Sequence, residues 1–226
     1  MHPMQSEIRK EFQLERIVYF SDAVLAIAIT LLTLEIKIPE IRENISDRIL
    51  GTAMLDLLPK FAGLVFSYLM IALYWSVHHR VFGFVIQATP KLLRLNLFFL
   101  FFIVLMAFST GFYGDYMGGE LVAAQWKIPM TFYALNLTFV GISNFYLWSY
   151  ISNPMNKLIE KPINPYTRHM SKARSLIVPG VTLCMVPVAY FINTLFAALV
   201  PALIPLAMKI AQRQISKKYL THINAK

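Results

Sequence analysis

The stretch from Arg16 to Glu35, RIVYFSDAVLAIAITLLTLE, decides how the rest of the chain is interpreted. From Ile17 to Leu34 it is almost wholly apolar, and at about 1.5 Å per residue it is long enough to cross a bilayer core. Asp22 lies inside this run. An ionisable group in a membrane helix is costly and normally faces a partner or a water-filled path. The stretch therefore predicts a transmembrane helix with a functional polar group.

The composition places the whole chain in a membrane. Of its 226 residues 57% are hydrophobic and only 15% are charged, and several apolar runs are as long as the first one. Residues 1–15 are polar, so we expect no cleavable signal peptide, and the first span must target the membrane. We predict an all-α polytopic membrane protein that lies in the lipid bilayer.

The apolar runs predict six transmembrane helices in one domain, residues 1–226. The expected spans are Ile17–Leu34, Leu57–Phe84, Leu95–Phe112, Ile128–Tyr150, Ala173–Tyr190 and Asn193–Ile210. Only Asn193 separates the last two, so a single re-entrant hairpin remains an alternative there. Pro179, Pro187, Pro201 and Pro205 predict kinks in these two spans.

Two connecting segments carry their own signals. The glycines after the third span predict a turn region, at Gly111, Gly114, Gly118 and Gly119. The link before the second span contains an amphipathic piece that predicts a short surface helix, with apolar residues Ile41, Ile45, Ile49 and Leu50.

The basic residues predict the orientation. With six spans, 16 of the 21 Lys and Arg residues lie on the side that holds the amino terminus. The positive-inside rule then places both termini in the cytoplasm of a cell-membrane protein. This placement also explains the net charge of +9, so we predict no nucleic-acid partner.

Rare polar residues of the first three spans fall at a similar depth. The first span carries Ser21 and Asp22, the second carries His78 and the third carries Asn96, each near the predicted cytoplasmic end. We therefore expect a buried hydrogen-bonded network between the helices. No metal site is expected, because adjacent histidines such as His78 and His79 point in different directions on a helix.

One face of the first span allows two interpretations. Steps of three and four residues from Phe20 pass through Ala23, Ile27, Thr30 or Leu31, and Leu34. Such a stripe can be ordinary helix packing. It can also line a pore, in which aliphatic rings form a constriction and a hydroxyl contacts ions.

Several of these residues match a known family. The pattern Arg16-x-x-x-Phe20-Ser21-Asp22 at the head of a first transmembrane helix resembles that of the endolysosomal potassium channel family, the transmembrane protein 175 type, in its single-repeat prokaryotic form. The segment from Trp75 to Phe82 and the Arg94-Leu-Asn96 start of the third span are similar too. The resemblance covers the first three spans well and the last three only by number and length.

The resemblance implies a potassium-permeable homotetramer whose four first helices line the pore. It implies a constriction at Ile27, further hydrophobic rings at Leu31 and Leu34, and the Thr30 hydroxyl near the filter. A structural network would tie the pore helix to the second and third helices, through Arg16, Phe20, Ser21, Asp22, Trp75, His78 and Asn96. It implies no cofactor beyond the permeant potassium ion.

Two functions other than a channel are compatible with the sequence. A proton-coupled secondary transporter would use Asp22 and the histidines as a proton relay. A membrane enzyme or scaffold would transport nothing. The chain contains no His-Glu-x-x-His, Gly-x-Ser-x-Gly or nucleotide-binding glycine motif, so we predict no enzymatic activity.

Overall fold

The computed structural model describes residues 3–37, 46–117, 127–160 and 163–224. In order, the helices are α1 Pro3–Leu34, α2 Asp47–Asp56, α3 Leu58–Phe82, α4 Pro90–Met117, α5 Lys127–Ile151, α6 Pro165–Leu183, α7 Met185–Phe191, α8 Thr194–Leu199 and α9 Ile204–Asn224. Two 3₁₀ turns, Pro154–Asn156 and Val200–Leu203, complete the set. The described residues form no strand, and a single bridge pairs Val85 with Ile159. The predicted all-α class is confirmed.

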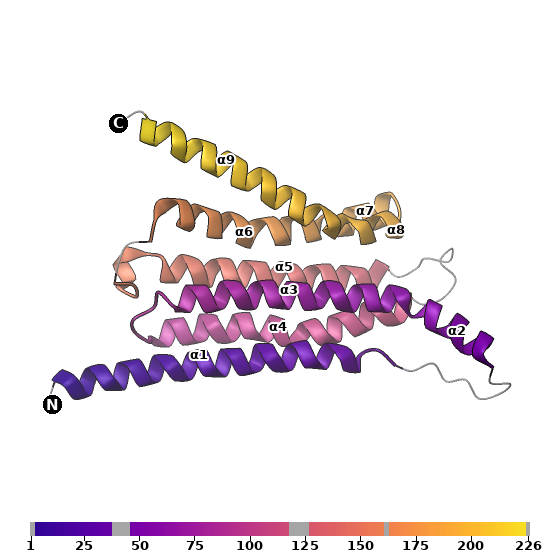
Figure 1. Cartoon of the computed structure of the whole chain (residues 1–226), viewed down its shortest axis with the longest axis horizontal. Helices are drawn as coiled ribbons and strands as arrows, with labels where there is room; N and C mark the ends of the chain where they lie inside the picture. Colours follow the sequence, from indigo (N-terminus) through magenta and orange to yellow (C-terminus); the bar gives the residue numbers. More distant parts are fainter. Residues whose placement is uncertain (1–2, 38–45, 118–126, 161–162, 225–226) are drawn as a thin grey trace.

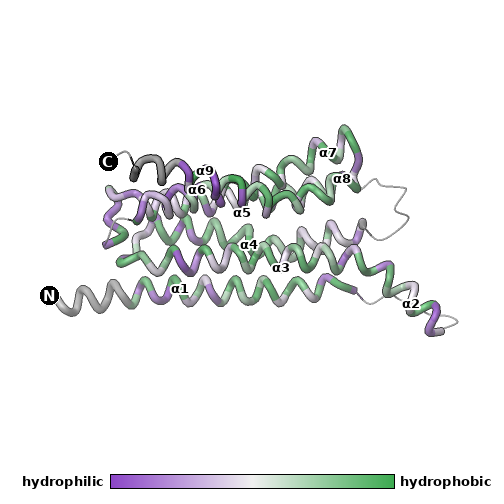
Figure 2. The backbone as a smooth tube through the Cα atoms, turned by 45° about the horizontal axis from the view of Figure 1, so that its top comes forward, coloured by the Kyte–Doolittle hydropathy of each residue, from purple (hydrophilic) through white to green (hydrophobic). Residues whose placement is uncertain are grey.

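The long helices form a bundle with α1 at one edge and α9 at the other (Figure 1). Helix α1 packs on α3 and α4, α4 packs on α5, α5 packs on α6, and α6 packs on α9. Both chain ends lie at the same end of the bundle (Figure 1). Hydrophobic residues prevail along the middle of the long helices (Figure 2), as expected of segments that cross a bilayer.

Five helical segments of the described chain are long and apolar enough to span a membrane. They are Phe12–Leu34, Leu58–Phe82, Pro90–Tyr116, Pro165–Phe191 and Thr194–Lys217. The fourth expected span, Ile128–Tyr150, corresponds to α5, which has the required length with 25 residues but is not among the five. Helix α5 lies between α4 and α6 and buries fourteen of its residues, including Asn136 and Asn144. A helix that faces protein on most sides can carry polar groups that a lipid-facing helix cannot.

The helix ends differ from the sequence-based bounds in several places. Helix α1 begins at Pro3, so the polar segment before Arg16 continues the first span as helix. Gly111 and Gly114 lie within α4 rather than in a turn, because glycine in an apolar, packed helix need not end it. Gly118 and Gly119 fall outside the described residues. The short surface helix is α2, which Ser46 caps by accepting from the Ile49 N–H; Ile41 and Ile45 lie outside the described residues.

The last two predicted spans are composite. Helix α6 continues through Pro179, and α7 follows from Met185 after a break at Cys184. Asn193 caps α8, its side chain accepting from the Leu195 N–H at 2.7 Å. A short amide side chain at an N-cap satisfies a helix donor that would otherwise lack a partner. The single Asn between two apolar runs is therefore a true helix boundary.

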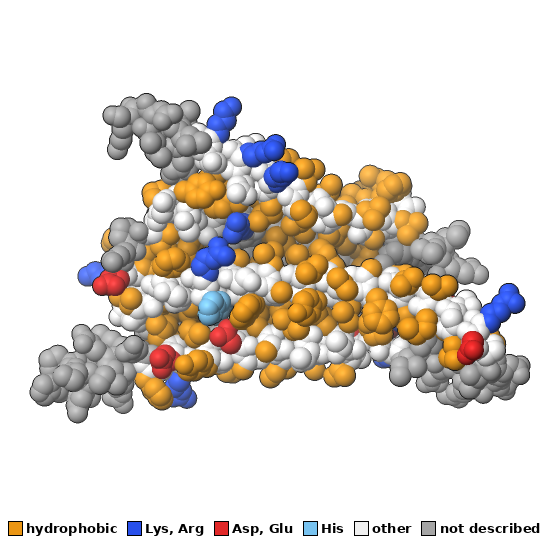
Figure 3. Space-filling model, in the orientation of Figure 1, with side chains coloured by type: hydrophobic (Ala, Val, Ile, Leu, Met, Phe, Trp, Pro, Cys, Tyr) orange, Lys and Arg blue, Asp and Glu red, His pale blue; other side chains and the backbone are white. Residues whose placement is uncertain are grey.

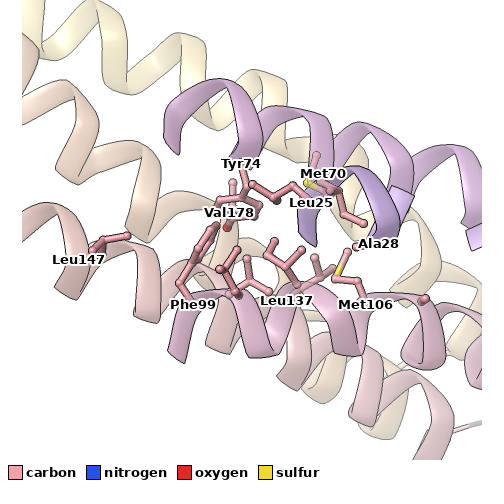
Figure 4. Packing of buried hydrophobic residues seen from close by; sticks show 14 of the residues in the cluster. Leu25, Ala28, Met70, Tyr74, Phe99, Met106, Leu137, Leu147 and Val178 are labelled. Carbon is pink, nitrogen blue, oxygen red and sulfur yellow. The ribbon is translucent and has the colours of Figure 1, made fainter. Parts of the chain in front are cut away.

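The core is apolar and closely packed between α1, α3, α4, α5 and α6. Leu25, Met70, Phe99, Leu137 and Val178 come from five different helices and meet in one cluster (Figure 4). At Gly141 of α5 the neighbouring helix approaches so closely that an added Cβ would lie 2.6 Å from Cδ of Pro179. Glycine at this point permits the contact between α5 and α6.

Candidate functional site

The stripe on α1 faces away from its own bundle. Ile27 and Leu34 are 57% and 72% exposed, and Phe20 is 52% exposed. On the opposite side of the same helix, Leu25 and Leu32 are completely buried. The sequence interpretation as packing inside the subunit is therefore wrong for the centre of this stripe. Its apolar side chains need cover from lipid or another copy of the chain.

Leu31 lies differently from the rest of the predicted pore residues. It is partly buried and packs against the core, at the border between the two faces of α1. The structure therefore places Ile27, Thr30 and Leu34 together on the exposed face, with Leu31 beside them.

The exposed threonines of α1 have their hydroxyl hydrogens already engaged. Thr30 Oγ1 donates to the Ile27 carbonyl oxygen at 2.8 Å, and Thr33 Oγ1 donates to the Thr30 carbonyl oxygen at 2.7 Å. A hydroxyl has one hydrogen and two lone pairs, so each oxygen presents acceptors outward. A hydroxyl oxygen with its lone pairs outward and its hydrogen engaged can contact a cation but has no hydrogen to donate to an anion.

Three side chains of the predicted network form a buried hydrogen-bonded chain with a defined direction. Ser21 donates to the Ile17 carbonyl oxygen at 2.7 Å, so its oxygen accepts from the Asn96 amide at 2.8 Å. The Asn96 carbonyl oxygen then faces His78 Nε2 at 2.8 Å, which must carry the hydrogen. All three residues are at most 1% exposed. The chain joins α1, α4 and α3 at one depth.

Asp22 belongs to a second contact beside this chain. Its Oδ1 accepts from Trp75 Nε1 at 3.0 Å, and the Trp75 ring stacks on His79 with centroids 5.7 Å apart. His79 is exposed. Asp22 therefore ties α1 to α3 without joining the Ser21, Asn96 and His78 chain.

Arg16 and Phe20 lie apart from both contacts. They line an open cavity of about 530 Å³ between α1 and the start of α4, together with Gln13, Thr89 and Leu93. The Arg16 guanidinium lies 5.9 Å from the centre of the Phe12 ring. No described hydrogen bond or ion pair links Arg16 to Asp22, because the six-residue spacing points the two side chains to different sides of α1.

A further polar layer between α3, α4 and α5 was not predicted from the sequence. Ser67 lies 2.8 Å from both the Tyr133 and the Thr110 hydroxyls, and Asn136 donates to Ser109 at 3.1 Å. All five residues are buried. Ser and Thr are so common in apolar helices that the sequence offered no signal beyond the two asparagines of α5.

The part of the chain that the structure describes holds no group of three His, Cys, Asp or Glu side chains placed to bind a metal ion. What it presents is an all-helical, multi-pass membrane protein with an uncovered apolar stripe on its first helix. A polar network anchors that helix to its neighbours. This combination defines a membrane-embedded bundle whose first helix keeps one face free for lipid or for another copy of the chain.

Comparisons with known proteins agree with this class. Residues 16–106 match the family described as endosomal/lysosomal potassium channel TMEM175. A potassium channel of Chamaesiphon minutus is 30% identical over 157 residues, covering 69% of this chain and 74% of the relative. A potassium channel of Chryseobacterium sp. (strain P1-3) is 32% identical over 123 residues, 54% of this chain and 60% of the relative. The chain belongs to the TMEM175 family.

Solved structures extend the similarity beyond the first helices. A crystal structure described as a lysosomal potassium-selective channel TMEM175 homologue from Chamaesiphon minutus superposes with a TM-score of 0.69 at 25% identity. The match covers 89% of this chain and 97% of that one. A variant of the potassium channel MtTMEM175, crystallised with a nanobody fusion protein, shares the fold with a TM-score of 0.61 at 21% identity. The relatives of this chain in the family are ion channels and not enzymes.

Proposed function

We propose that this chain is the subunit of a potassium-permeable homotetrameric channel. The observation that carries the proposal is the exposed stripe of Phe20, Ala23, Ile27, Thr30 and Leu34 on α1, in a chain whose relatives are named potassium channels. One chain supplies one such stripe. Several copies around a rotation axis cover it and enclose a path.

The side chains of the stripe suggest how the path is controlled. A ring of Ile27 side chains makes a narrow apolar neck, in which hydration limits conduction. The Thr30 oxygens lie one turn further along, with lone pairs free to contact a cation. The Ile27 side chains and the Thr30 hydroxyls do not form a cage of backbone carbonyl oxygens. We therefore expect the width of the neck and the Thr30 hydroxyls to set the preference for potassium.

The orientation follows from the placement of basic residues. Both termini lie at one end of the bundle (Figure 1), next to most of the Lys and Arg residues. We propose that this end is cytoplasmic in the cell membrane. Ions that leave the cytoplasm then meet Phe20 before Ile27 and Leu34 last.

Ion flux from liposomes tests the proposal. The purified protein is reconstituted into liposomes, and flux is measured with potassium, sodium, caesium and protons as alternative permeant ions. Protons are included because a Gallus gallus relative, 28% identical over 81% of this chain, is named a proton channel TMEM175. We expect potassium flux in the parent protein, and larger but less selective flux in Ile27→Asn because a polar ring hydrates the neck.

Leu206→Asn is the matched control. Leu206 is 56% exposed, almost the same as Ile27, but lies on α9 at the other edge of the bundle. Unchanged flux in Leu206→Asn with altered flux in Ile27→Asn supports the α1 pore. Equal effects of Ile27→Asn and Leu206→Asn on flux would contradict the α1 pore. A flux that saturates and requires a proton gradient would also contradict the channel proposal and favour a secondary transporter.

A further inference from the structure

A small cavity between α3, α5 and α6 lies outside the α1 site. Its polar lining comes from Arg80 of α3, Trp148 of α5, and Thr167, Ser171 and Arg174 of α6. Lys and Arg side chains gather over α6 and α9 towards the end of the bundle that carries both termini (Figure 3). The cavity thus lies in a basic region of the surface.

Two residues that line this cavity carry buried hydrogen-bond donors without acceptors among the described residues. Trp148 is 2% exposed, and its Nε1 has no partner among the described residues. The buried Nε of Arg174 has none either. No described carboxylate forms an ion pair with Arg174 or Arg80. Buried donors and uncompensated cations are costly, so their arrangement indicates a bound acceptor.

The donor set fits an anion with several oxygens. Indole and guanidinium groups only donate, and an arginine fork matches the geometry of a phosphate. The enclosed part of the cavity measures about 10 Å³, which is room for one water-sized oxygen atom. A phosphate at the mouth can place one oxygen inside and leave its others outside, next to the exposed Arg80.

The surroundings suit a lipid rather than a soluble anion. Val77 and Val81 of α3, with Phe84 just beyond its end, complete the cavity wall. Leu176 and Leu206, of the adjoining helices α6 and α9, are 50% and 56% exposed. Helices α6 and α9 lie on the side of the bundle away from α1 (Figure 1). Basic groups beside apolar surface at a membrane boundary bind anionic lipid headgroups.

We propose that this cavity binds the phosphate of an anionic phospholipid from the leaflet next to the chain termini. Arg80 and Arg174 hold the phosphate, and one phosphate oxygen accepts from Trp148 Nε1. The acyl chains lie against the apolar surface of α6 and α9. The site is independent of conduction, so its test does not require an active channel.

Lipid titration of the purified full-length protein in detergent tests the proposal. Short-chain phosphatidylglycerol, phosphatidylcholine and inorganic phosphate are added separately, and the unfolding temperature is followed. We expect phosphatidylglycerol to stabilise the parent at concentrations where the other two have little effect. The Arg80→Gln/Arg174→Gln variant should need about tenfold more phosphatidylglycerol, because it loses the charge-assisted bonds.

Two further variants keep the test decisive. Trp148→Phe retains an aromatic ring but removes the N–H, and should weaken the response severalfold even if the double variant does not fold. Arg94→Gln is the matched control, since Arg94 is exposed near the start of α4 and does not line the cavity. An equal loss in Arg94→Gln, or equal stabilisation by phosphatidylcholine or inorganic phosphate, would overturn the proposal.

Discussion

Trp75 of α3 donates its indole N–H to the carboxylate of Asp22 on α1, with the two atoms 3.0 Å apart. This bond places an acidic group of the first helix against the second long helix rather than on the exposed stripe. The first prediction follows from it.

Asp22→Ala should destabilise the assembled protein more than it changes ion preference. It leaves the Trp75 donor without its acceptor, which costs about 1 kcal/mol at a partly exposed site. Asp22→Asn keeps an oxygen in place and should cost less. Thermal unfolding in detergent and reversal potentials in bilayers measure the two effects. A variant that is as stable as the parent but has altered selectivity would place Asp22 in the ion path instead.

The Ser21, Asn96 and His78 chain predicts strong energetic coupling. Asn96→Leu removes two buried hydrogen bonds and leaves the His78 donor unpaired, so we expect a loss of about 1–3 kcal/mol. His78→Phe should be costly alone but should add little to Asn96→Leu, because the bond is already absent. A double-mutant cycle on unfolding free energies measures the coupling. Additive losses would mean that the two side chains act separately.

The contact between α5 and α6 predicts different outcomes for two glycines. In Gly141→Ala the new methyl group overlaps Pro179, and forcing the helices apart should cost about 1–3 kcal/mol. Gly180→Ala, on α6, meets no atom within 4 Å and should be neutral or slightly stabilising. Thermal unfolding of both variants checks this. Similar stability of the two would show that the helices adjust freely.

The two threonines of α1 provide a matched pair for selectivity. Thr30→Val keeps the shape but removes the outward oxygen from the stripe, so the potassium-over-sodium permeability ratio should fall severalfold. Thr33 also donates to the backbone but lies to one side of the line through Ile27 and Leu34, so Thr33→Val should have a smaller effect. Reversal potentials in mixed potassium and sodium solutions measure both. A larger fall in the permeability ratio for Thr33→Val than for Thr30→Val would place the ion path on the Thr33 side of α1.

Much of the fold was predictable because long apolar runs have few alternatives in a membrane. The first three spans and the all-helical class follow from that. The helical extension of α1 to Pro3 did not, because residues 3–11 are mostly polar or charged and carry only two large apolar residues, Met4 and Ile8. The breaks between α6 and α9 did not follow from the prolines, because Pro179 and Pro187 lie within α6 and α7, whereas the helices break at Cys184 and at Asn193.

The site was predictable where a rare polar residue marked it. Ser21, Asn96 and His78 stood out in apolar surroundings, and the structure joins them by hydrogen bonds. Arg16 was assigned to the same network only because it belongs to the Arg16-x-x-x-Phe20-Ser21-Asp22 pattern. In the structure it lines the open cavity between α1 and the start of α4. The layer around Ser67 and Tyr133 was missed because hydroxyl residues are ordinary in such helices. The pore roles of Ile27, Thr30, Leu31 and Leu34 stay predictions.

The polar interior of α5 has a consequence for biosynthesis. A helix with Asn136 and Asn144 inserts poorly on its own, since each amide must leave water without a partner. Asn136 donates to Ser109 of α4, which is already made, whereas Asn144 donates to Ser175 of α6, which is not. We therefore expect α4 to retain α5 at the translocon until α6 emerges and the second amide finds its acceptor.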